Sequence, residues 1–130
     1  MTTRLSAAAL PAINSAATPA YDRADLSAGI VHFGVGNFHR AHQAVYLDAL
    51  FNLGEGHDWA LVGAGVRQAD EAMRQKLMDQ DWLTSVVEQE ADISAAHVTG
   101  AMIDYLPPGD ATAVIAKLAD PAIRIVSLTI

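Results

Sequence analysis

The fold of this chain is decided by the stretch Gly29–Gln43, which reads Gly-Ile-Val-His-Phe-Gly-Val-Gly-Asn-Phe-His-Arg-Ala-His-Gln. Its first residues are β-branched or aromatic, which predicts a buried strand over Gly29–Phe33. Gly34 and Gly36 then permit a tight turn and a close approach to the backbone, because neither carries a Cβ. Apolar residues at helical spacing follow, and they predict a helix from Phe38 to Leu53. The apolar stripe assigned to the core comprises Phe38, Ala41, Val45, Ala49 and Leu53.

A strand, a Gly-x-Gly turn and a helix in this order form the phosphate cradle of a dinucleotide-binding fold. The third glycine of the usual pattern is replaced by His39. We expect the pyrophosphate of a cofactor to contact the segment Gly34, Val35, Gly36, Asn37 and Phe38, together with Arg40. The alternative is a solvated basic patch of His39, Arg40 and His42 that opposes the helix dipole. A metal site at His39 and His42 is disfavoured, because no third ligand of the usual type is nearby, and we expect none.

The bulk properties narrow the class of protein. A length of 130 residues with 52% hydrophobic content is enough for one modest packed domain. The net charge of −7 disfavours a nucleic-acid partner, since there is no basic excess to neutralise phosphates. Cysteine is absent. The sequence contains no run of 18 apolar residues, so it predicts no membrane span. We expect a cytoplasmic monomer that binds a small molecule.

The rest of the chain alternates strand and helix signals, which predicts an α/β, Rossmann-like, doubly wound and mainly parallel sheet. Residues 1–26 form a surface leader with a short helix at Ser6–Leu10 ended by Pro11. The other predicted elements are strands at Trp59–Val62, Trp82–Glu90 and Ile123–Ile130, a strand or extended segment at Ala96–Tyr105, and helices at Asp70–Asp79 and from Asp110 or Thr112 to Leu118.

Two features after the second predicted strand bear on a cofactor. The Gly63-Ala64-Gly65 segment is a second phosphate turn, a close passage beside an adenosine, or a plain strand-ending turn. Asp70 is the candidate for binding the ribose hydroxyls of the adenosine and for setting a preference for NAD over NADP. Its alternative role is to cap the following helix, and Glu71 is the nearby competitor. Arg67 could instead pair with a 2′-phosphate.

The segment Gly34–Gln43, which we name the glycine-turn segment, resembles the N-terminal signature of the mannitol dehydrogenase family. This family comprises the polyol-specific long-chain dehydrogenases and their hexuronate-reductase relatives. The likeness lies in Gly34-x-Gly36-x-Phe38-x-Arg40, Phe38–Gln43, Tyr46–Leu50, Gly54–Gly56, Asp58-Trp59, Gly63–Arg67 and Ile123–Ile130. It implies an NAD-dependent oxidoreductase that interconverts a polyol and a ketose, mannitol and fructose. A hexuronate (fructuronate) reductase of the same family is the alternative, and a nucleotide-binding module without catalysis is the alternative from another class.

The resemblance also implies a general acid/base lysine in a Lys-x-x-x-x-Asn-x-x-His pattern on a helix of a later domain. Five positions after Lys76 and Lys117 stand Asp81 and Ala122, so neither lysine fits. We therefore expect no catalytic residue in this chain. Residues 27–130 would be the N-terminal part of a dinucleotide-binding domain, with the catalytic domain beyond residue 130.

Overall fold

Four parallel strands form the central sheet of the computed structural model, which describes residues 2–130. Their spatial order is β5 (Met102–Leu106), β2 (Ala60–Ala64), β1 (Ala28–Phe33) and β6 (Ile125–Leu128). The chain builds outward from β1 through β2 to β5, and then returns to the other side of β1. The strand order therefore reverses between β1 and β6, which is the topological switch point of a doubly wound sheet. The predicted Rossmann-like α/β class is confirmed.

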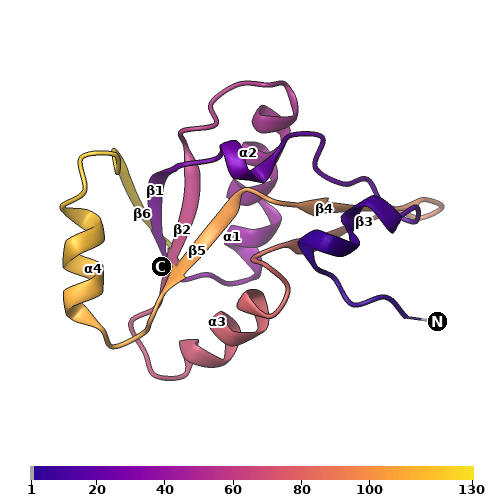
Figure 1. The fold of residues 1–130 in the computed structure, drawn as a ribbon. Helices are drawn as coiled ribbons and strands as arrows, with labels where there is room; N and C mark the ends of the chain where they lie inside the picture. The colour runs from indigo at the N-terminus through magenta and orange to yellow at the C-terminus, as the bar shows by residue number, and fades with distance from the viewer. Residues whose placement is uncertain (1) are drawn as a thin grey trace.

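Helices cover both faces of this sheet (Figure 1). α1 (Asn37–Ala41), α2 (Gln43–Asn52) and α3 (Asp70–Met78) lie on one face, and α4 (Ala111–Leu118) lies on the other. The change of face accompanies the change of direction, because parallel crossovers are right-handed. The prediction of a helix after Asp110 is confirmed, and the Asp110 carboxylate caps α4 by accepting the N–H of Ala113 at 2.9 Å.

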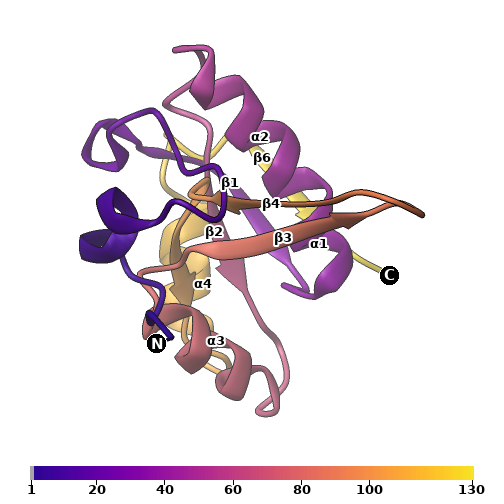
Figure 2. The same cartoon turned by 90° about the vertical axis from the view of Figure 1, so that its right-hand side faces the viewer.

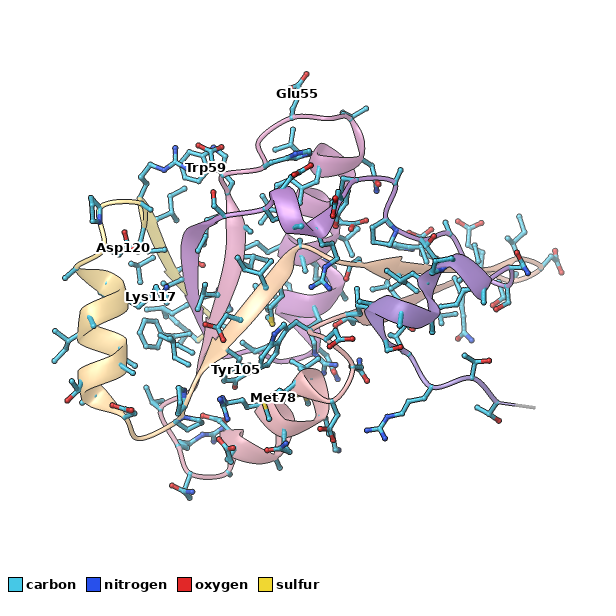
Figure 3. The ribbon with its side chains drawn as sticks, viewed as in Figure 1. Glu55, Trp59, Met78, Tyr105, Lys117 and Asp120 are labelled. Carbon is cyan, nitrogen blue, oxygen red and sulfur yellow. The ribbon has the colours of Figure 1, made fainter. Side chains whose placement is uncertain are left out.

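Alternation along the strands divides the core into two layers. Ile30 and Leu61 pack with Phe51 and Tyr105 under the α1–α3 face. Val31 and Val62 pack with Leu106 under α4. In the side-chain view, Tyr105 lies between the sheet and α3, and Lys117 lies on α4 at the other side of the sheet (Figure 3). The apolar runs of β1 and β2 are continuous because both of their faces are buried.

The predicted helix Phe38–Leu53 is in fact two helices, α1 and α2, separated at His42 with φ −124° and ψ −79°. The predicted apolar stripe is wrong, because Phe38 and Leu53 are 65% and 76% exposed. The residues that face the core are His39, Ala44, Asp48 and Phe51. Two of these inward residues are polar: Asp48 accepts hydrogen bonds in the interior, and the His39 ring stacks on the ring of His32. Hydrophobicity alone therefore assigns the wrong face.

A β-hairpin of β3 (Thr84–Gln89) and β4 (Ser94–Thr99) stands outside the main sheet as a separate antiparallel pair. It packs against α1 and α2 (Figure 2). The strand predicted at Trp82–Glu90 is therefore present, but it belongs to this hairpin. The predicted segment Ala96–Tyr105 contains two strands, because the chain leaves β4 and enters β5 at Gly100 and Ala101.

The leader segment before β1 is tied to the domain by side-chain hydrogen bonds. The Tyr21 hydroxyl donates to Oδ1 of buried Asp48 at 2.5 Å, and Arg23 donates to the carbonyls of Gly100 and Met102. The segment forms two 3-10 helices, η1 (Ala7–Ala12) and η2 (Arg23–Asp25). The prediction that Pro11 ends the first helix is wrong, because Pro11 lies inside η1.

Within residues 2–130, no helix combines the length and the apolar character needed to cross a bilayer.

Candidate functional site

The turn after β1 leaves the carboxyl end of the sheet at the switch point. Gly34 has φ +93°, a left-handed conformation that favours glycine, and its N–H donates to the Ala64 carbonyl of β2. Gly36 begins α1 as its N-cap without a side-chain capping bond. A Cβ placed on Gly36 would meet no heavy atom within 4 Å. The turn therefore presents bare backbone to open space, as a phosphate cradle requires.

One cavity at this edge, which we name the Asp70 cavity, has a volume of about 470 Å³. It joins the end of β1 to the turn after β2 and to the end of β6. Gly34 and Asp70, two of the residues predicted to bind a cofactor, line it together. The lining residues are Phe33, Gly34, Val66, Arg67, Asp70, Leu128 and Thr129.

The Asp70 carboxylate is held by the turn that precedes α3. Its Oδ2 atom accepts the N–H groups of Val66 at 3.0 Å and Arg67 at 2.9 Å, and the Arg67 guanidinium lies 3.6 Å from Oδ1. Glu71 instead accepts a hydrogen bond from Arg74, which also donates to the Tyr105 carbonyl. Asp70 is thus the acidic residue that reaches the cavity, whereas Glu71 pairs within α3 with Arg74, and Arg74 joins α3 to β5.

The glycines after the second predicted strand serve packing. β2 runs through Gly63 to Ala64 and does not end at Val62 as predicted. A Cβ on Gly63 would lie 2.7 Å from the Val35 side chain, and one on Gly65 would lie 2.5 Å from Cβ of Asp70. Gly65 therefore lets the Asp70 side chain come close to the end of β2.

The other predicted cofactor residues point in different directions. The Val35 side chain is buried in the core, which leaves only its backbone to face a ligand. Arg40 folds back along α1, where it donates to Oδ1 of Asn37 at 2.7 Å and to the Gly36 carbonyl at 3.2 Å. Arg40 and Asn37 line a separate cavity of about 210 Å³ beside Ser85 in β3. The structure therefore brings Gly34 and Asp70 into one cavity, and places Arg40 on the hairpin side of the turn.

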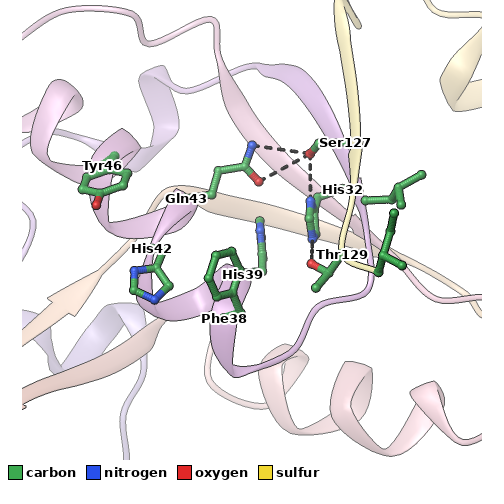
Figure 4. A pocket seen from close by; sticks show the side chains of 10 residues that line it. His32, Phe38, His39, His42, Gln43, Tyr46, Ser127 and Thr129 are labelled. Atoms are coloured by element: carbon green, nitrogen blue, oxygen red, sulfur yellow. Dashed lines mark hydrogen bonds between the residues drawn. The ribbon is translucent and has the colours of Figure 1, made fainter.

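A second cavity, which we name the His39 cavity, lies between the α1–α2 pair and the end of β6 (Figure 4). Its volume is about 600 Å³. Its walls are aromatic and aliphatic, with imidazole, amide and hydroxyl groups between them. The lining residues are His32, Phe38, His39, His42, Gln43, Tyr46, Ser127, Leu128, Thr129 and Ile130.

A pair of stacked imidazoles forms the floor of this cavity. The rings of His32 and His39 lie parallel within 8°, with their centroids 3.9 Å apart. His32 shares hydrogen bonds with the hydroxyls of Ser127 at 2.7 Å and Thr129 at 3.0 Å. His39 is 1% exposed, and neither of its ring nitrogens has a hydrogen-bond partner in the described part of the chain. Burial, together with electrostatic repulsion that His32 and Arg40 would exert on a protonated ring, lowers the pKa of His39 to about 4. Burial also lowers the pKa of His32.

The sequence analysis singled out His39 as the residue in the place of the third glycine, but it missed the residues that hold it. Ser127 in β6 and Thr129 just after it stand two apart in an otherwise apolar run, and both hydroxyls reach the His32 ring on one side of the sheet. That alternation is the signal that indicates two hydroxyls aimed at the same neighbour.

Comparison with known proteins gives a consistent result. The family described as the mannitol dehydrogenase Rossmann domain matches residues 28–130. A mannitol 2-dehydrogenase of Cereibacter sphaeroides is 57% identical over 117 residues, which cover 89% of this chain and 24% of that protein. One of Pyricularia oryzae is 50% identical over 113 residues, covering 86% of this chain and 22% of that protein.

Two solved structures share the fold. The Pseudomonas fluorescens mannitol 2-dehydrogenase, in a ternary complex with NAD and D-mannitol, gives a TM-score of 0.92 at 47% identity, covering 96% of this chain and 26% of that chain. A D-sorbitol dehydrogenase in substrate-free form gives 0.89 at 39% identity, covering 98% and 27%. The chain thus spans about a quarter of the length of these relatives.

Proposed function

The chain belongs to the mannitol dehydrogenase family, and on that premise we propose that it is the cofactor-binding part of an NAD-dependent oxidoreductase. The reaction is the interconversion of a polyol and a ketose, D-mannitol and D-fructose. One observation carries the proposal: a bare-backbone turn at the switch point shares a cavity with an acidic side chain. The solved relative in complex with NAD and D-mannitol supports this choice of cofactor and substrate.

The residues of the turn fit a dinucleotide. Gly34 and Gly36 leave room for the pyrophosphate beside the first N–H groups of α1, which have no acceptor within the helix. Asp70 lies across the same cavity, where its carboxylate would accept the ribose hydroxyls of the adenosine. Arg40 would lie at the outer side of the turn and contribute positive charge. The bound nicotinamide supplies the hydride chemistry, and this chain orients it.

The acid/base group of the reaction would lie outside this chain. Lys76 is in α3 and Lys117 is in α4, and neither lines the Asp70 cavity or the His39 cavity. We infer that residues 27–130 form the first part of a dinucleotide-binding domain, whose catalytic lysine is contributed by a further domain. Within residues 2–130 we assign no catalytic residue.

Titration calorimetry of the chain with NAD tests the proposal. We expect Gly36→Val to weaken NAD binding by roughly a hundredfold or more, about 2.7 kcal/mol, because the added side chain fills the cradle. The φ of −110° at Gly36 suits an L residue, and a Cβ there meets no atom, so the fold should tolerate the change. Gly36→Ser is the companion variant, because serine also favours an N-cap.

Ala116→Val is the control, since it places the same valine side chain on the exposed face of α4. It should bind NAD as the parent does. NAD affinity that stays unchanged in folded Gly36→Val and Gly36→Ser would contradict a cradle at this turn.

A further inference from the structure

We propose that His32 and His39 are a positioning pair: their stacked, uncharged imidazoles fix α1 against β1 and so hold the Gly34–Gly36 turn in its binding geometry. This inference rests on the proposed function, because the turn that the pair positions is the proposed cofactor cradle. It assigns a role to two buried side chains that the hydride chemistry does not use.

One ring of the pair stands where the usual dinucleotide-binding pattern has a glycine. In the usual pattern the third glycine lets the helix pack closely on the strand. Here His39 occupies that position, and its ring lies flat on the ring of His32 from β1, with 3.9 Å between centroids. A spacer of two rings therefore sets the separation of α1 from β1. The ring of His39 is 1% exposed, so it is fixed by its packing.

The end of β6 also holds His32 in place. His32 meets Ser127 of β6 and Thr129, the residue after β6, through both of its ring nitrogens. Thr129 in turn donates its backbone N–H to the Phe33 carbonyl, and its Cβ lies 3.5 Å from where a Cβ of Gly34 would stand. A continuous line of contacts thus runs from α1 through both rings to β6 and back to the turn (Figure 4).

The arrangement requires both rings to be neutral. A proton on either ring would place a buried charge against the other, with little solvent to screen it. The neighbouring elements offer His39 no compensating negative charge: β1 contributes His32, α1 contributes Arg40, and the α1–α2 junction contributes His42. Tyr46 of α2 lines the same cavity, and β6 contributes only hydroxyls. The lowered pKa of both histidines agrees with this requirement.

A pH titration of NAD affinity between about pH 3.5 and pH 8 tests the pair, because this range spans the pKa of about 4 of His39. The parent should lose affinity toward the acid end, because protonation releases α1 and loosens the turn. His39→Phe keeps a ring that stacks but cannot take a proton. We expect it to bind NAD within about threefold of the parent at pH 8 and to show a flatter pH profile. His39→Ala removes the spacer and should bind roughly tenfold or more weakly at pH 8.

His97→Gln is the matched control, because His97 lies in β4 away from the turn, and its profile should follow that of the parent. The proposal is overturned if His39→Ala binds NAD as tightly as the parent, or if His39→Phe keeps the full pH dependence. An NMR titration that gives His39 an ordinary pKa near 6.5 would overturn it as well.

Failure of the proposed function would look different, since the parent would then bind no NAD at any pH. In that case the NMR signals of the Gly34 and Gly36 backbone amides test whether the histidine pair positions the turn. We expect them to shift in His39→Ala and to stay near the parent positions in His39→Phe. Unchanged signals in His39→Ala would show that the stack does not position the turn.

Discussion

The Asp70 cavity and the His39 cavity open at the same edge of the sheet, yet they differ in charge. Leu128 and Thr129 of the β6 end line both. The Asp70 cavity, on the β2 side of the switch point, contains a guanidinium and a carboxylate. The His39 cavity, on the β6 side, has no carboxylate, guanidinium or ammonium side chain among its lining residues. The difference teaches that one edge of the sheet offers, side by side, a cavity with charged side chains and a cavity without them.

Differences in burial explain why the Asp70 cavity and the His39 cavity differ in charge. Two backbone N–H groups and the Arg67 guanidinium surround the Asp70 carboxylate at a partly exposed position. His39 has no such partner and is fully enclosed, so the neutral form is favoured. We infer that a dinucleotide across the switch point would place its adenosine half on the charged side.

The largest expected effect concerns turnover. Neither cavity contains a lysine, and the pKa of about 4 makes the enclosed His39 a weak base, so the chain alone should oxidise no mannitol at saturating NAD. General acid–base catalysis is worth roughly 10²–10⁴ in rate, and that factor is missing. A spectrophotometric assay for NADH checks this, with NAD binding in the same sample as the control. Turnover at the rate of ordinary dehydrogenases would show that one cavity carries the chemistry.

The second-largest effect is a change in folding stability with pH, caused by the buried His39. His39 has a pKa of about 4 when folded against an ordinary value of 6.5, so the unfolded chain binds this proton more readily. The stabilising contribution is therefore complete above about pH 6.5 and is lost as the pH falls toward 4, by up to about 3 kcal/mol.

Urea unfolding of the parent and of His39→Phe at a series of pH values measures this loss. The two proteins differ only at residue 39, so the difference between the two curves reports the effect of the His39 ring. A difference that stays constant from neutral pH to about pH 4 would mean that His39 titrates normally in the folded protein.

The sequence predicts the switch-point architecture well, because it rests on strong local signals. The Gly34 turn, the apolar runs of β1 and β2, and the Asp110 cap each follow from one residue type at one position. Membership of the mannitol dehydrogenase family also followed from the glycine-turn segment, and the comparisons confirm it.

What the sequence could not predict depends on partners distant along the chain. Asp48 faces the interior because Tyr21 and the Gly100 N–H donate to it, and hydrophobic periodicity does not register such bonds. The inward position of His39 depends likewise on His32, and through it on hydroxyls nearly a hundred residues away. The assignments of Gly34–Phe38, Arg40 and Asp70 to a cofactor stay predictions until binding is measured.

A smaller effect concerns the choice between NAD and NADP at the charged side. Asp70→Ser should raise the affinity for NADP relative to NAD by about one decade or more, roughly 1.4 kcal/mol, because a carboxylate repels a 2′-phosphate. Asp70→Asn is the matched variant, since its amide oxygen can still accept the N–H groups of Val66 and Arg67. Dissociation constants for both dinucleotides check the ratio. If only the stability of Asp70→Ser changes and neither variant alters the ratio, Asp70 serves the turn alone.

The smallest effect concerns Arg67, which we expect to influence how strongly the Asp70 cavity distinguishes NADP from NAD. Its guanidinium is 79% exposed and lies 3.6 Å from Asp70, in a position to meet a 2′-phosphate. Such exposed pairs are worth about 0.2–1 kcal/mol, so Arg67→Ala should weaken NADP binding by roughly two- to fivefold and leave NAD binding nearly unchanged. The backbone N–H that Asp70 accepts is kept in this variant, and Arg67→Lys keeps the charge as the control. The difference between Arg67→Ala and the parent should shrink as salt is raised toward about 1 M, where the screening length is about 3 Å. Equal losses for NAD and NADP would assign Arg67 to the shared diphosphate and leave Asp70 as the residue that distinguishes the two cofactors.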